Sequence, residues 1–139
     1  MSDAEVSRSV VLDSYALLAY LNGEAGQLLV QQTLEQAQQG NLRAYLSLIS
    51  LGEVLYITER RRGLPDAQRV LALVQSLPLT LCEVTRELVL DAAHIKANHA
   101  ISYADAFVAA LAQAENAVVL TGDSEFESLE KLVRVEWLK

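Results

Sequence analysis

Short apolar segments alternate with longer amphipathic ones along the whole sequence, and this alternation constrains the fold more than any other feature. The short segments, rich in Val, Leu and Ile, are residues 9–12, 45–49, 79–84, 117–120 and 133–137. The longer segments have apolar residues at helical spacing and cover residues 14–21, 24–39, 50–62, 66–76, 85–98 and 102–115. Strands that are apolar throughout and separated by helices are typical of parallel sheets covered on both faces. We therefore predict an α/β fold with a mainly parallel central sheet of about five strands.

The size and composition of the chain predict a single domain, residues 1–139. The sequence is 52% hydrophobic and 21% charged, and its longest apolar runs fall short of the roughly 20 residues that a membrane-spanning helix needs. The polar start, with Asp3 and Glu5, does not resemble a secretory signal. A single cysteine, Cys82, excludes an intramolecular disulfide. These features lead us to expect a cytoplasmic protein without a membrane segment.

Four acidic residues occur among apolar neighbours. Asp13 directly follows the first predicted strand, and Asp123 follows the fourth. Glu53 and Asp105 are expected on the first turns of the helices at 50–62 and 102–115. Since the carboxyl ends of parallel strands meet at one edge of a sheet, all four acids can converge there.

Converging carboxylates repel one another unless cations neutralise them. An all-oxygen site suits hard divalent ions, so we predict Mg²⁺ or Mn²⁺ as the cofactor. Neither His nor Cys accompanies the four acids in the sequence, which argues against zinc.

A purely structural role is the alternative for each of these acids. Ser50-x-x-Glu53 and Ser102-x-x-Asp105 both match the capping box, in which the acid stabilises the first turn of a helix. Asp13 could likewise cap a helix or occupy a turn, and so could Asp123.

The ordered set of motifs resembles the PIN-domain ribonucleases, and specifically the VapC-type toxins. The motifs are Val-Val-Leu-Asp13-Ser14-Tyr, Ser50-Leu-Gly-Glu53-Val, Ser-Tyr-Ala-Asp105-Ala-Phe and Leu-Thr121-Gly-Asp123-Ser-Glu-Phe. The resemblance covers nearly the whole chain and implies a PIN-like three-layer α/β/α fold. It also implies an acidic quartet, Asp13, Glu53, Asp105 and Asp123, that is catalytic and binds the metal, with the hydroxyl residues Ser14 and Thr121 nearby. Glu125 and Glu127 would be at most outer contributors.

The function that the resemblance implies is a metal-dependent endoribonuclease acting as the toxin of a toxin-antitoxin pair. Its partners would be an RNA substrate, a cognate antitoxin protein and a second copy of the chain in a homodimer. In the expected mechanism, Asp13 and Asp105 are the principal metal ligands and Asp123 is a further ligand. Glu53 is a ligand or orients the attacking water.

Three other functions fit parts of the pattern. A PIN endonuclease could act in RNA processing instead of as a toxin. A non-catalytic Mg-binding signalling domain would share the layered α/β fold. Such a domain needs paired acids after the first strand and a lysine after a late strand, whereas this sequence has a lone Asp13 and no lysine near Asp123. A dehalogenase-type phosphatase needs an aspartate two residues after Asp13, where Tyr15 stands.

The overall charge is the reverse of that expected for passive nucleic-acid binding, since 11 Lys and Arg against 18 Asp and Glu give a net charge of −7. Arg60, Arg61 and Arg62 form the one basic run, which could contact RNA phosphates or complement a helix dipole. Arg43, Lys96 and His99 could form a basic rim. We expect surface positions for His94 and His99 and a packing role for Trp137. Core or interface positions are expected for Tyr15, Tyr20 and Tyr56.

Overall fold

The computed structural model describes residues 8–138 and shows an α/β fold with one five-stranded sheet. All paired strands are parallel, in the order β3-β2-β1-β4-β5. The strands are β1 (Ser9–Leu12), β2 (Arg43–Ser47), β3 (Thr80–Cys82), β4 (Val118–Thr121) and β5 (Val135–Trp137). The helices are α1 (Ser14–Asn22), α2 (Gln27–Gln38), α3 (Leu48–Arg62), α4 (Leu64–Ser76), α5 (Arg86–Asn98), α6 (Tyr103–Ala114) and the 3₁₀ helix η2 (Ser124–Leu129). The predicted fold class is thus confirmed.

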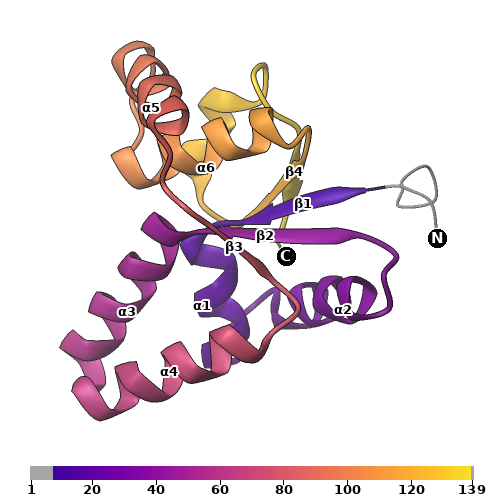
Figure 1. Ribbon diagram of the computed structural model, residues 1–139, viewed down its shortest axis with the longest axis vertical. Helices are drawn as coiled ribbons and strands as arrows, with labels where there is room; N and C mark the ends of the chain where they lie inside the picture. Colours follow the sequence, from indigo (N-terminus) through magenta and orange to yellow (C-terminus); the bar gives the residue numbers. More distant parts are fainter. Residues whose placement is uncertain (1–7, 139) are drawn as a thin grey trace.

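Helices cover both faces of the sheet, with α1 to α4 on one side and α5 and α6 on the other (Figure 1). Successive residues of β1 alternate between the two resulting cores: Val11 packs with α6, whereas Val10 and Leu12 pack with α1 and α2. Burial on both faces explains why every residue of this strand after Ser9 is apolar.

The register of the sheet places three chain segments at one edge. Leu12 at the end of β1 pairs with Leu46 of β2 on one side and with Leu120 of β4 on the other. The next residues, including Asp13, therefore leave the sheet side by side. This arrangement is the convergence that the sequence predicts for parallel strands.

The junction between β2 and α3 differs from the prediction. The strand ends at Ser47, whose hydroxyl accepts a hydrogen bond from the amide of Ile49 at 3.1 Å, and the helix begins at Leu48. The last paired residues of β2 are Leu46 with Leu12 of β1 and Ser47 with Cys82 of β3, so the strand ends two residues before residue 49, the predicted end. Glu53 consequently lies on the second turn of α3, and the capping-box interpretation of Ser50-x-x-Glu53 is wrong.

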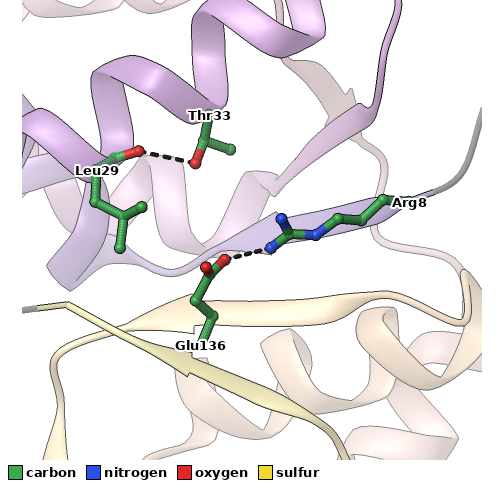
Figure 2. Close-up of polar contacts among 4 residues, drawn as sticks. All are labelled: Arg8, Leu29, Thr33 and Glu136. Atoms are coloured by element: carbon green, nitrogen blue, oxygen red, sulfur yellow. Dashed lines mark hydrogen bonds and ion pairs between the residues drawn. The ribbon is translucent and has the colours of Figure 1, made fainter.

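Figure 2 shows two polar contacts, an ion pair that joins the start of β1 to β5 and a hydrogen bond within α2. Arg8, just before β1, forms an ion pair with Glu136 of β5. On α2, the buried Thr33 hydroxyl donates to the Leu29 carbonyl at 2.8 Å. Within residues 8–138, no helix has both the length and the hydropathy that crossing a bilayer would take.

Candidate metal centre

Asp13 is fixed at the centre of the carboxyl edge of the sheet. It is the N-cap of α1, and its Oδ1 accepts from the amide of Ala16 at 2.8 Å. Its Oδ2 accepts from the hydroxyl of Thr121 at the end of β4. The side chain thereby links the end of β1 to the end of β4, and only 1% of the residue is exposed.

Burial raises the pKa of Asp13 from 3.8 to about 7. The hydrogen bonds from Thr121 and Ala16 lower this pKa, but less than burial raises it. The neighbouring charges of Asp123 and Glu53 raise it further. The carboxyl group is thus held where its negative charge is costly unless a cation compensates it.

Asp105 reaches the same edge from the first turn of α6. Ser102 caps this helix, its Oγ accepting from the amide of Asp105 at 3.1 Å. The capping prediction is therefore confirmed for Ser102, and Asp105 is nevertheless buried against the other acids. Burial raises its pKa to about 8, and the charges of Asp123 and Asp13 contribute in the same direction.

Asp123 and Glu125 are positioned by the turn that follows β4. The amide of Asp123 donates to Thr121 Oγ1 at 2.9 Å, and Asp123 Oδ1 accepts from the amide of Glu125 at 2.9 Å. This turn brings Glu125 back toward α6, so that carboxylate oxygens of Asp105, Asp123 and Glu125 all lie within 4.8 Å of one another. Glu125, expected only as an outer contributor, belongs to the centre of the acidic group, whereas Glu127 is exposed and lies outside it.

Glu53 approaches from α3. Its Oε1 accepts a hydrogen bond from the hydroxyl of Ser14, the residue after Asp13. Both hydroxyl residues expected near the site, Ser14 and Thr121, thus bond to its acids. Of the predicted quartet, Asp105 and Asp123 lie within 4.8 Å of each other and of Glu125. Asp13, expected as a principal metal ligand, and Glu53 lie outside that group, and Asp13 interacts by charge with Asp123, Glu53 and Asp105.

The residues of this acidic group fit a hard divalent ion. In residues 8–138, the three acids within 4.8 Å of one another supply oxygen ligands alone, with no histidine or cysteine beside them. Oxygen ligands favour Mg²⁺ or Mn²⁺ over zinc. Capping and clustering coexist here, since Asp13 and Asp123 each cap a helix and still face other acids.

Ser50 has an unusual environment one turn before Glu53. Its hydroxyl is buried, and within the described part of the chain it is the one buried side-chain oxygen or nitrogen without a hydrogen-bond partner. Such a group costs free energy in the folded state.

The expected basic rim does not form as predicted. Arg43 begins β2 and lies at the amino end of the strand, away from the acids at its carboxyl end. Lys96 donates to the carbonyl of Ile101 at 2.6 Å. His94 is exposed and His99 half-buried, which agrees with surface positions.

The aromatic predictions hold only in part. Trp137 is half-buried and packs against the core beside α6, as expected. Tyr20 is half-buried too. Tyr15 and Tyr56 are 46% and 49% exposed, so neither is a core residue. Tyr15 lies on the first turn of α1 and Tyr56 in the middle of α3, and both helices bury other residues.

Comparison with solved structures identifies proteins of the same fold at low sequence identity. The toxin-antitoxin structure VapBC2 from Rickettsia felis, bound to a DNA fragment from its promoter, has a TM-score of 0.75 at 19% identity, covering 94% of this chain and 99% of that one. DNA-bound VapBC from Salmonella typhimurium gives 0.74 at 19% identity, with 93% and 97% covered. VapC20 from Mycobacterium tuberculosis, a toxin that cleaves the sarcin-ricin loop, gives 0.70 at 18% identity, with 86% and 94% covered.

Sequence comparison establishes the family. Among curated proteins, none matches the chain. The family model of the PIN domain matches residues 10–132, a span that includes Asp13, Glu53, Asp105 and Asp123. The chain therefore belongs to the PIN-domain family.

Proposed function

We propose that this protein is an Mg²⁺- or Mn²⁺-dependent endoribonuclease and the toxin of a toxin-antitoxin pair. The observation that carries the proposal is the group formed by Asp105, Asp123 and Glu125, with Asp13 buried beside it. This much converging negative charge is stable when a divalent ion neutralises it. Membership of the PIN family and the likeness to VapC structures support a nuclease that acts on RNA.

The acids have three kinds of role in the proposed mechanism. Asp105, Asp123 and Glu125 would hold the ion, and Asp13, whose orientation Thr121 fixes, would add negative charge. A divalent ion bound there would polarise the scissile phosphate and lower the pKa of an attacking water. Glu53, oriented by the Ser14 hydroxyl, would be the proton acceptor. No side chain of the protein has to act as a nucleophile.

A partner protein would cover the apolar surface on the helices of one face. The large hydrophobic side chains exposed on α2, α3 and α4 are Leu28, Tyr56, Leu64 and Leu73. The similar structure from Klebsiella pneumoniae is a toxin-antitoxin complex. We assign this surface to a cognate antitoxin, expect the active unit to be a homodimer, and place the protein in the cytoplasm, where its single thiol stays reduced.

The test of the nuclease is cleavage of total cellular RNA by the purified protein with Mg²⁺ or Mn²⁺. The double variant Asp13→Ala, Asp105→Ala and an EDTA sample should both lose the discrete fragments that the wild type produces. Asp91→Ala, which removes an exposed aspartate of α5, is the matched control and should cleave normally.

Calorimetric titration with Mn²⁺ separates metal binding from catalysis. The wild type should bind the ion and the double variant should not. Equal Mn²⁺ affinity of the two proteins, or cleavage that persists in EDTA, would contradict the proposed function. Co-purification of an active nuclease with its excess partner would leave the metal mechanism intact and argue for RNA processing instead of a toxin.

A further inference from the structure

A hollow of about 370 Å³ opens beside the metal centre, between α1, the turn after it and the end of α3. Its walls are Tyr15, Leu18, Glu24, Ala25 and Arg61. The volume lies within the roughly 300–1,000 Å³ of typical small-molecule sites. Because Tyr15 contacts Gly122, the residue before Asp123, one end of this hollow adjoins the loop that carries this acid.

Tyr15 is held against the loop that carries Asp123. A methyl group added to Gly122 would lie 2.3 Å from Cε1 and 2.8 Å from Cζ of the Tyr15 ring, so the ring packs directly on the glycine backbone. Even so, 46% of Tyr15 is exposed. An aromatic ring that is fixed on one side and open on the other is suited to stack on a nucleobase.

Arg61 differs from the two arginines beside it. Arg60 lies over the ring of Tyr56 at 5.0 Å, and Arg62 donates to the side chain of Asn22 at 3.3 Å. Arg61 has neither a side-chain hydrogen bond nor an ion pair with any residue between 8 and 138. Its guanidinium is therefore available to an anion at the hollow.

We propose that this hollow binds one nucleotide of single-stranded RNA next to the scissile phosphate, with its base on Tyr15 and a backbone phosphate at Arg61. This inference rests on the proposed ribonuclease function. Tyr15 packs on Gly122, the residue before Asp123, so the hollow is the surface next to a phosphate held at Asp105 and Asp123. An RNA strand bound there offers both a base for the exposed ring and a phosphate for the guanidinium of Arg61. Glu24 also lines the hollow, and its negative charge repels the phosphate and so lowers the affinity for RNA.

Steady-state kinetics on a fluorescein-labelled RNA oligonucleotide test this assignment. The oligonucleotide spans the strongest cleavage site found in total RNA. Tyr15→Leu should raise KM by about 5- to 150-fold with kcat little changed, the range expected for the loss of one stacked base. Tyr15→Phe should restore the wild-type KM. Arg61→Gln should raise KM and reduce the slope of log affinity against log salt by about 1.

Two variants outside the hollow control for nonspecific effects. Leu90→Ala removes an exposed apolar side chain of α5, and Arg60→Gln changes the arginine next to Arg61. Both should keep the wild-type KM, whereas Glu24→Gln should lower it. Thermal melting of each variant confirms that it is folded.

The possible failures are distinguishable. An active wild type with an unchanged KM in Tyr15→Leu and Arg61→Gln overturns the nucleotide site and leaves the nuclease standing. Loss of binding to a co-expressed protein partner at unchanged KM would assign the hollow to a protein and overturn the inference. Absence of metal-dependent cleavage in the wild type would refute the proposed function itself.

Discussion

Replacing Asp13 with asparagine tests whether burial of charge governs the stability of the metal centre. In the wild type, burial raises the pKa of Asp13 from 3.8 to about 7. Asparagine keeps an oxygen for the Ala16 amide and places an NH₂ group near Thr121 Oγ1, which can accept from it. The substitution therefore removes the charge while the N-cap of α1 is retained.

The pKa shift fixes the sign and size of the effect. The folded protein keeps a proton on Asp13 up to about pH 7, whereas the unfolded chain loses it near pH 3.8. The resulting stabilisation is complete below about pH 4 and is lost as the pH rises through 7. Between pH 5 and pH 8 the loss is about 3 kcal/mol, from about two pH units at about 1.4 kcal/mol each. Asp105, with its pKa raised to about 8, acts in the same direction.

Urea denaturation in EDTA at pH 5, 6, 7 and 8 measures this loss. The free energy of unfolding of the wild type should fall across the series, and that of Asp13→Asn should fall by about 3 kcal/mol less. Asp91→Asn, at an exposed position, should follow the wild type. Added Mn²⁺ should reduce the pH dependence of the wild type's free energy of unfolding. Parallel curves for the wild type and Asp13→Asn, or a wild type that gains stability with pH, would refute the reasoning.

Four further substitutions test separate features of the site. Ser50→Ala should raise the free energy of unfolding by about 1 kcal/mol, because a buried hydroxyl without a partner is removed. Ser47→Ala should lower it by about 1 kcal/mol, because the cap of α3 is lost. Urea denaturation measures both changes, and stability changes in the same direction would contradict these roles of the two serines. Gly122→Ala should lower the free energy of unfolding by about 1–3 kcal/mol, because the added methyl group meets the ring of Tyr15. The loss should be smaller in a Tyr15→Ala background, and an equal loss in both backgrounds would contradict the contact between Gly122 and Tyr15. Glu125→Gln should weaken Mn²⁺ binding at least about tenfold by calorimetry, and unchanged affinity would remove Glu125 from the ligand set.

The sheet and the convergence of its acids could be predicted because they follow from strand composition. Apolar runs such as residues 9–12 need burial on both faces, and parallel strands put their following residues on one edge. Asp13 and Asp123 are therefore found where the sequence places them. Arg43 is the first residue of β2, so it falls at the amino edge of the sheet, opposite the acids, and cannot join a basic rim around them.

Boundaries and turns could not be predicted as well. Ser47 and Ser50 are both acceptable helix caps, and the choice between them depends on where the pairing of β2 with β1 and β3 ends, a property of the assembled sheet. Glu125 joins the acids only because the turn after Asp123 is tightly wound. The Thr-Gly-Asp-Ser-Glu sequence contained a usable signal, an N-cap aspartate two residues before a second acid, but not the direction of the turn.

The central position of β1 has a consequence for biosynthesis. This strand is made first, yet one of its two neighbours, β4, is made only after α6, and three acids of the centre, Asp105, Asp123 and Glu125, also come late. A growing polypeptide that ends at α5 contains Asp13 and Glu53 but leaves one edge of β1 unpaired. Because such distant pairings form slowly and in late steps, the acidic group can assemble only once residues 105–125 have left the ribosome. Incomplete translation products would therefore lack the acidic group.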